Sequence, residues 1–184
     1  MKKILSLILT IFFLFQNNSI ANEKIINLLK EGNKLIFIRH AYAPGNGDPK
    51  NFSLKNCSTQ RNLNQEGIKQ AEKIGLFFDT NKIIIGKILS SEWCRCKDTS
   101  KVAFNSYETF NALNSFYEER FSKNKNKQIK DLKNYIHNLK EDKNVIFVTH
   151  YVVIYEILNT SSLSGEIIVT DKNLKILGRM NTNN

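Results

Sequence analysis

The sequence has few histidines, cysteines and prolines, and these shortages exclude several kinds of protein. Its 184 residues include three histidines, three cysteines and two prolines. Three thiols without histidines nearby make a poor zinc site, so we expect no metal centre. No internal repeat and no Pro- or Gly-rich linker divides the chain, and its length suits a single domain with a substantial core.

The N-terminal apolar run is too short to cross a membrane. It covers residues 4–15, which is 12 residues, whereas a spanning helix needs about 20. Lys2 and Lys3 precede the run, and a polar segment ending in Ala21 follows it. This pattern is typical of a secretory signal peptide at residues 1–21. We therefore expect residues 22–184 to form an exported domain, periplasmic or secreted, with no stable membrane insertion after cleavage; an uncleaved anchor is the alternative.

Arginine is also scarce, and this makes each arginine informative. The formal net charge is +10, but the chain contains 22 lysines and only five arginines. The lysines are scattered, and with 24 asparagines and 22 isoleucines they match what an AT-rich genome encodes. We therefore expect no nucleic-acid binding. Because this chain uses lysine for most of its positive charge, we interpret the arginines as positions where the planar guanidinium group and its paired N–H donors are needed.

Apolar periodicity and turn residues predict strands that alternate with helices. The expected strands are residues 35–38, 83–89, 145–148, 166–170 and 174–177. The expected helices are residues 23–31, a helix that follows the N-cap Asn64 and reaches Phe78, and residues 92–103, 127–139 and 152–158. Residues 41–62 form a long loop, and residues 109–121 are ambiguous. The fold class is α/β, a three-layer α/β/α sandwich with a mixed, mainly parallel central sheet.

Two of the apolar runs end on a histidine. Residues 35–40 read LIFIRH and residues 145–150 read VIFVTH, while the third histidine, His137, falls on a polar helix face and is expected at the surface. Short, wholly apolar runs are typical of strands buried on both faces of a parallel sheet. Ligands bind just outside the carboxyl ends of such strands. The pattern therefore predicts one crevice that contains Arg39, His40 and His150.

At these residues the chain resembles the histidine phosphatase superfamily, whose fold is the phosphoglycerate-mutase-like fold. The hallmark of that family is an Arg-His-Gly triplet after the first strand. Arg39 and His40 match it, and Ala41 stands in the third position, where it slightly narrows the approach of a phosphate.

The other motifs of the family follow in order, over about residues 34 to 158. They are the first-helix segments NLNQEG (62–67) and QA (70–71), the second-arginine segments SSEWCR (90–95) and DTS (98–100), and the second-histidine segment VTH (148–150). Further segments resemble an exported bacterial branch of the family, namely APGNGDP (43–49), CSTQRNL (57–63) and GE (165–166).

The resemblance implies a role for each residue of the crevice. His40 would be the nucleophile and would carry the phosphoryl group as phosphohistidine. Arg39 and Arg95 would hold the phosphate oxygens with paired donors, and a protonated His150 would donate to an equatorial oxygen. No metal or cofactor is needed, because these cationic side chains supply the positive charge.

The residue that protonates the leaving group is less clearly marked. The family uses a carboxylic acid, in many members a couple of dozen residues beyond the second arginine. Glu118 lies at this distance and is the first choice. Glu119, Asp48 and Glu92 are the competitors.

The cysteines and one further arginine leave alternatives open. In an oxidising compartment Cys57 can pair with Cys94 or Cys96 and tie the long loop to the helix that carries Arg95. We expect the Cys57–Cys96 pair.

Arg61 is either a phosphate contact or a residue that stabilises the loop.

The expected function is metal-independent hydrolysis of phosphate monoesters through a phosphohistidine on His40. The substrate would be a phosphorylated small molecule or a phosphoprotein. The alternatives are a catalytically degenerate member that binds phosphorylated ligands, a phosphomutase, and a basic binding module whose affinity falls with salt and does not depend on His40.

Overall fold

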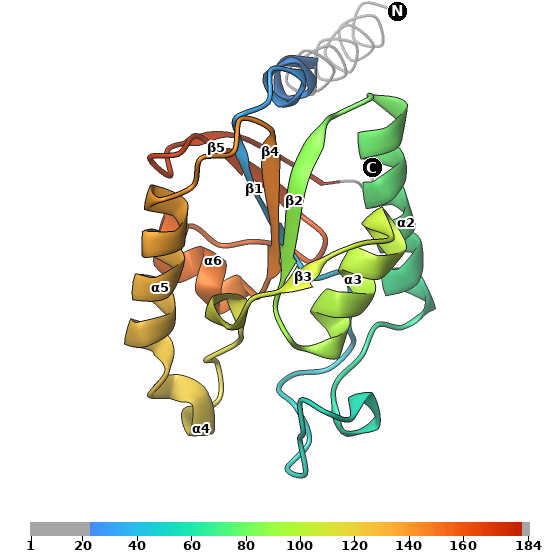
Figure 1. Cartoon of the computed structure of the whole chain (residues 1–184). Helices are drawn as coiled ribbons and strands as arrows, with labels where there is room; N and C mark the ends of the chain where they lie inside the picture. The colour runs from blue at the N-terminus through green and yellow to red at the C-terminus, as the bar shows by residue number, and fades with distance from the viewer. Residues whose placement is uncertain (1–22, 182–184) are drawn as a thin grey trace, which may run out of the picture.

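Six strands form one mixed sheet at the centre of the molecule (Figure 1). The computed structural model describes residues 23–181, so the expected signal peptide lies outside the described residues. In chain order the strands are β1 (Leu35–Arg39), β2 (Ile85–Ser90), β3 (Glu108–Thr109), β4 (Asn144–Thr149), β5 (Ile167–Thr170) and β6 (Ile176–Met180). Their order in the sheet is β3-β2-β4-β1-β5-β6, in which β1 to β4 run parallel, β5 pairs antiparallel with β1, and β6 pairs antiparallel with β5.

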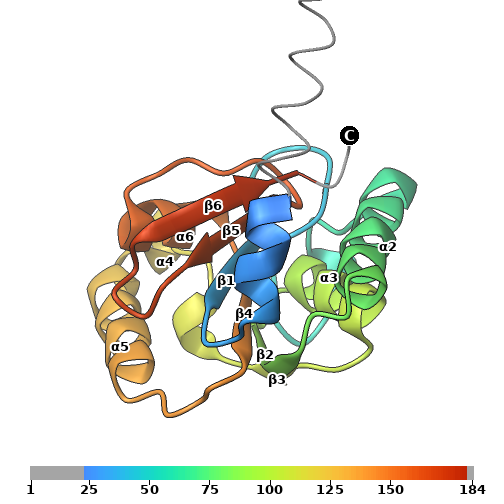
Figure 2. The same ribbon diagram turned by 90° about the horizontal axis from the view of Figure 1, so that it is seen from above.

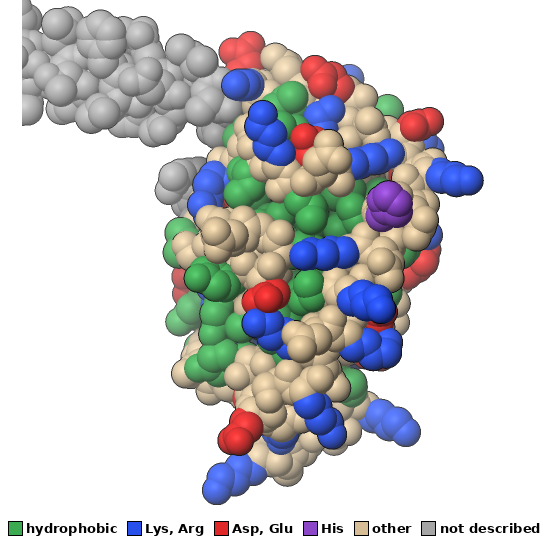
Figure 3. Space-filling model, turned by 90° about the vertical axis from the view of Figure 1, so that its left-hand side faces the viewer, with side chains coloured by type: hydrophobic (Ala, Val, Ile, Leu, Met, Phe, Trp, Pro, Cys, Tyr) green, Lys and Arg blue, Asp and Glu red, His purple; other side chains and the backbone are tan. Residues whose placement is uncertain are grey.

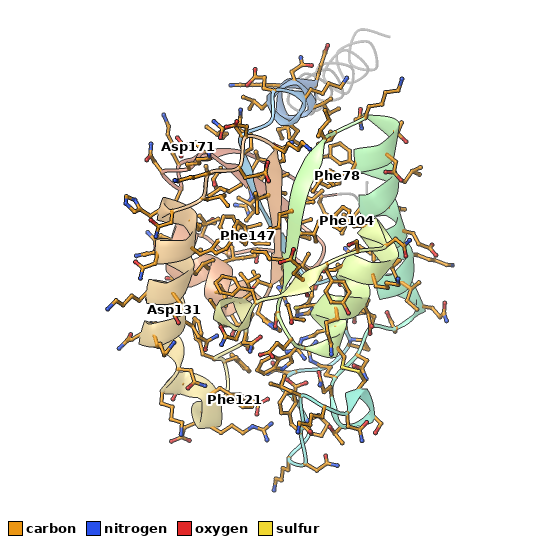
Figure 4. The ribbon with its side chains drawn as sticks, in the orientation of Figure 1. Phe78, Phe104, Phe121, Asp131, Phe147 and Asp171 are labelled. Atoms are coloured by element: carbon orange, nitrogen blue, oxygen red, sulfur yellow. A yellow bond between two sulfur atoms is a disulfide. The ribbon has the colours of Figure 1, made fainter. Side chains whose placement is uncertain are left out.

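Helices cover both faces of this sheet (Figure 2). A helix at residues 23–30, α2 (Gln65–Thr80) and α3 (Cys94–Phe104) pack on one face, and α5 (Lys125–His137) and α6 (Tyr151–Leu158) pack on the other. The labelled aromatic residues show the two resulting cores: Phe147 lies on the α5 side of the sheet, and Phe78 and Phe104 lie on the α2 side (Figure 4). The expected three-layer sandwich with a mixed sheet is confirmed.

Helix α2 forms as its sequence predicts. The side chain of Asn64 accepts a hydrogen bond from the N–H of Gly67 at 2.9 Å and so caps the first turn. Ala71, Ile74 and Phe78 recur at helical spacing and are buried against the sheet.

Three elements begin two residues later than expected. Strand β2 begins at Ile85, and helix α3 begins at Cys94 because Trp93 keeps an extended backbone. Strand β6 begins at Ile176 because Leu174 has a φ of 65° and closes a turn onto Asp171.

The two helices in the second half of the chain match the prediction within two residues. The expected helices at 127–139 and 152–158 are α5 and α6, and His137 is exposed as expected. The ambiguous segment divides into three short pieces, which are β3, a 3-10 helix at Asn111–Leu113 and α4 (Glu119–Ser122).

The pairing of β1 with β4 positions the crevice. Arg39 lies opposite Thr149 in the parallel register, and the N–H of His40 donates to the carbonyl of Thr149 at 2.9 Å. The two strands therefore end at the same level. The long loop after β1 and helix α4 lie at this end of the sheet (Figure 1).

A disulfide joins Cys57 to Cys94, so the expected pairing of Cys57 with Cys96 is wrong. Successive residues of an α-helix are rotated by about 100°, which places residues two apart on nearly opposite sides. Cys94 faces the long loop at the start of α3, whereas Cys96 faces the sheet, where its Sγ lies 3.7 Å from the carbonyl oxygen of Thr149. The expected function of the bridge, tying the loop to the helix that carries Arg95, is unaffected.

On the face shown in Figure 3, lysine and arginine side chains are dispersed among other residues and form no single basic patch. Within residues 23–181, no helix is both long enough and apolar enough to span a membrane.

The disulfide predicts the number of reactive thiols. Under denaturing, non-reducing conditions we expect one thiol per chain, that of Cys96. In the folded protein this thiol should resist alkylation, because burial raises the pKa of Cys96 to about 12 and keeps it protonated. Titration with a thiol reagent before and after denaturation checks both points. Finding three thiols in the denatured, unreduced protein would contradict the bridge.

Candidate active site

The two histidines meet at the carboxyl ends of β1 and β4. His40 follows β1 and His150 follows β4, each side chain is 2% exposed, and the ring centroids lie 5.4 Å apart. The structure thus brings together the residues that the two apolar runs singled out.

His40 is held as a neutral ring with one free nitrogen. Its Nδ1 lies 2.8 Å from the carbonyl oxygen of Ala41, and because a carbonyl can only accept, Nδ1 carries the proton. Burial lowers the pKa of His40 well below its usual range, and the nearby Arg95 and Arg39 add to this effect. At neutral pH, Nε2 therefore presents a lone pair, which is what a nucleophile requires.

Ala41 fits the position where the family hallmark has glycine. It is fully buried, and it does not belong to the described residues with positive φ. Its N–H donates to Oγ1 of Thr99 at 2.9 Å, and the Thr99 hydroxyl donates to the carbonyl of Arg95 at 2.7 Å. Thr99 therefore links the backbone beside His40 to the first turn of α3.

His150 is also neutral in this structure, whereas the sequence predicted a charged ring. Burial lowers the pKa of His150 well below its usual range, and Arg95 is the second cause. Nη2 of Arg95 lies 3.5 Å from Nδ1 of His150 and can only donate, so Nε2 carries the proton and donates to Oγ of Ser91 at 2.9 Å. The hydroxyl of Ser91 in turn donates to Oδ1 of Asn114 at 3.1 Å. This chain orients the ring with Nδ1 toward Arg95.

The two expected phosphate-binding arginines line the same cavity, and each keeps an unused donor. Nη1 of Arg39 donates to the carbonyl of Ser162 at 2.8 Å, and Nη1 of Arg95 donates to the carboxylate of Asp48 at 2.9 Å. The Nε atoms of Arg39 and Arg95 are buried and have no hydrogen-bond partner among the described residues. Because an unpaired buried donor costs free energy, these two N–H groups indicate a site for an anion.

Asp48 is the buried anion that holds the second arginine in place. Its side chain is 3% exposed, and it accepts from Arg95, from the indole of Trp93 at 3.0 Å and from the backbone N–H of Arg61 at 2.9 Å. Burial raises the pKa of Asp48, but Arg95 and these hydrogen bonds outweigh burial, so the net pKa is lowered. A carboxylate held ionised in this way is a poor proton donor.

Glu118 is the other carboxylate that lines the cavity, and it is 22% exposed. Its Oε1 accepts from the N–H of Asp48 at 2.7 Å, and its Oε2 pairs with Arg120 at 2.6 Å. Glu119 is exposed and lies outside the cavity lining, and Glu92 faces a neighbouring depression, bound to Asn114. Among the four candidates, Glu118 is therefore the one that lines the cavity without being paired to a buried arginine.

Arg61 and Gln70 fasten the loops around the crevice, and the sequence suggested such a role only for Arg61. Arg61 donates to the carbonyls of Gly47 and Ala43, which is the loop-stabilising role, and it also lines the cavity. Gln70 on α2 accepts from the N–H of Tyr42 and donates to the carbonyl of Ser164. No short-range pattern marks such contacts. The one signal in the sequence for the contacts of Gln70 was the presence of a polar residue among the buried positions of helix α2.

The cavity is small and has mixed walls. Its volume is about 140 Å³, below the range typical of sites for drug-sized ligands. The histidines and arginines line it together with Trp93, Phe121 and three tyrosines, Tyr42, Tyr117 and Tyr151. Among residues 23–181, no group of three or more His, Cys, Asp or Glu side chains is arranged to hold a metal ion.

Solved structures with the same architecture identify the fold. Protein histidine phosphatase SixA complexed with tungstate has a TM-score of 0.56 at 13% identity, over 81% of this chain and 97% of that one. A SixA protein from Agrobacterium tumefaciens has a TM-score of 0.57 at 18% identity, over 81% and 98%. Phosphoglycerate mutase from Thermus thermophilus has a TM-score of 0.57 at 15% identity, over 80% and 98%.

The chain has the histidine phosphatase fold. No family model matches the sequence, and no curated protein matches it either. At identities this low, the likeness to solved structures establishes the fold, and an activity has to be argued from the site.

Removing the carboxylate of Asp48 should weaken the site and the fold together. We expect Asp48→Asn to lower the free energy of unfolding at pH 7 by about 3 kcal/mol, because Arg95 would then stay buried without its ionic partner. Folding lowers the pKa of Asp48, so its carboxylate stabilises the folded state fully above ~3.9, the pKa of Asp in the unfolded chain. This stabilisation is lost as the pH falls through the lower pKa of the folded state. Urea unfolding at several pH values therefore should show the difference between wild type and variant shrinking below about pH 4.

Asp131→Asn is the matched control. Asp131 pairs with Lys127 on the surface of α5, where an exposed pair contributes about 0.5 kcal/mol or less. Equal losses for the two variants would contradict the assigned role of Asp48.

Proposed function

We propose that this protein hydrolyses phosphate monoesters through a phosphohistidine on His40. The observation that carries the proposal is the pair of unpartnered, buried Nε–H groups of Arg39 and Arg95 beside a neutral His40 with a free Nε2. Arg39, Arg95 and His40 line one cavity, and guanidinium donors beside a nucleophile suit a transferring phosphoryl group, because its equatorial oxygens carry most of the charge.

The reaction has two steps. Nε2 of His40 attacks phosphorus in line with the ester oxygen, the P–O bond to the leaving group breaks, and Glu118 donates a proton to that oxygen. A water molecule then attacks the phosphohistidine, Glu118 takes its proton, and the P–N bond breaks to release inorganic phosphate. Glu118 lies at the mouth of the cavity and pairs with Arg120, which is 36% exposed, so water reaches this carboxylate.

His150 assists once an anion is bound. A phosphate dianion beside Nδ1 favours the protonated ring, since an opposite charge at this distance raises the pKa of a histidine. The ring then donates from Nδ1 to an equatorial oxygen, while Ser91 continues to hold Nε2. In this role His150 is neutral in the free protein and becomes protonated when the substrate binds.

We propose that the domain acts outside the cytoplasm, on a phosphorylated small molecule or a phosphoprotein. The N-terminal pattern at residues 1–21 and the Cys57–Cys94 bridge both support an oxidising compartment. The same N-terminal pattern disfavours a phosphomutase.

Replacing His40 should abolish turnover and leave anion binding. We expect the mature domain to hydrolyse 4-nitrophenyl phosphate and His40→Ala to do so only at the background rate, while tungstate still binds to the variant. Because burial lowers the pKa of His40, kcat/KM should not fall as the pH drops through ~6.5, the pKa of an unperturbed histidine, after correction for ionisation of the ester. Tungstate binding without His40-dependent hydrolysis of this ester or a panel of natural ones would instead favour the degenerate, ligand-binding alternative.

The role of Glu118 predicts a dependence on the leaving group. An alkoxide needs a proton as it leaves, whereas 4-nitrophenolate does not. We expect Glu118→Gln to lower kcat/KM, which reports the step that expels the leaving group, by about 10²-fold for an alkyl phosphate and far less for 4-nitrophenyl phosphate. Steady-state kinetics on both esters check this, with Glu119→Gln as the control. Equal losses on the two esters would remove Glu118 from the role of acid.

A further inference from the structure

Three tyrosines surround the mouth of the phosphate cavity and remain exposed to solvent. Tyr42, Tyr117 and Tyr151 are 38%, 44% and 39% exposed, and all three line the cavity. They come from separate parts of the chain: the loop after β1, the segment before α4 and the first residue of α6. Binding of a phosphoryl group does not need these rings, because arginines and histidines already surround that position.

Tyr117 and Tyr151 form an aromatic corner. Their ring centroids lie 5.7 Å apart and the ring planes meet at 61°, so the face of one ring stands beside the edge of the other. The hydroxyl of Tyr117 accepts a hydrogen bond from Nδ2 of Asn46 at 3.2 Å. This contact holds one wall of the corner against the long loop.

The corner lies directly beside the proposed phosphate position. Cζ of Arg39 is 5.4 Å from the centroid of the Tyr151 ring, and Tyr151 follows His150 in the chain. Tyr42 lines the same cavity, and its N–H donates a hydrogen bond to Oε1 of Gln70. A group attached to the ester oxygen of a phosphate bound in this cavity therefore comes next to partly exposed tyrosine rings.

We propose that this corner is a leaving-group subsite for an aromatic ring carried on the ester oxygen directly or through one carbon. The inference rests on the proposed function, and it narrows the substrate class to aryl and arylmethyl phosphates, whether free or as part of a peptide. Aromatic rings prefer edge-to-face and offset contacts, and a corner of two rings offers a face and an edge together. A saturated ring of the same size gains the apolar contact but not the aromatic one.

The test compares the binding of two phosphonates that differ only in the ring. Benzylphosphonate is an isostere of phenyl phosphate that cannot be hydrolysed, and cyclohexylmethylphosphonate is its saturated counterpart. We expect the wild-type protein to bind benzylphosphonate about three- to tenfold more tightly in isothermal titration calorimetry. The ratio should fall to about one in Tyr117→Ala and Tyr151→Ala, and it should persist in Tyr117→Phe and Tyr151→Phe, which keep the rings.

Tyr155→Ala is the control, because Tyr155 is 56% exposed on the same helix as Tyr151 and does not line the cavity. We expect this variant to keep the wild-type ratio, and all variants to keep the wild-type circular dichroism. Equal binding of the two phosphonates, no binding of either, or a ratio that the alanine variants leave unchanged would overturn the subsite. Hydrolysis of phenyl phosphate is measured separately. If it is absent while the binding ratio behaves as expected, the hydrolytic function fails and the subsite stands.

Discussion

The parallel pairing of β1 with β4 is the constraint on which the site depends. The register places Arg39 opposite Thr149, and the hydrogen bond from the His40 N–H to the Thr149 carbonyl continues the ladder by one residue. Because residues 35–38 and 145–148 of these strands are apolar and buried on both faces, a slip in register would leave backbone donors unpaired in the core. The two catalytic candidates therefore meet through main-chain geometry, and side-chain contacts then refine their positions.

Electrostatics explains why the rest of the site takes its form. Arg39, Arg61 and Arg95 gather around two histidines with little access to water, and the most deeply buried carboxylate among them is Asp48. Burial, with the nearby cations as the second cause, lowers the pKa of both histidines and keeps them neutral, which suits His40 as a nucleophile and makes His150 dependent on a bound anion for its charge. Asp48 compensates Arg95 and also receives the Trp93 indole N–H, so the loop and the start of α3 share one buried anion.

Much of this arrangement could be predicted from local sequence. The N-cap Asn64 and the apolar stripe of α2 marked that helix, and the runs at residues 35–40 and 145–150 marked the strands that present the histidines. The contacts between distant segments could not be predicted in the same way. Asp48 and Glu118 were both candidates for the acid because each is a carboxylate near a motif. They separate only through their partners, since one is paired with a buried arginine and the other with an exposed one.

The sequence by itself determined the alternation of strands and helices, the class of fold, and the two histidine-ended strands, because these depend on periodicities that neighbouring residues share. The tertiary structure decided which cysteine pairs with Cys57, where the charges are compensated, and that Tyr117 and Tyr151 share a corner. These features depend on which side chains face each other after the chain has folded. A rotation of about 200° between positions 94 and 96 on α3 separates a bridged cysteine from a buried thiol.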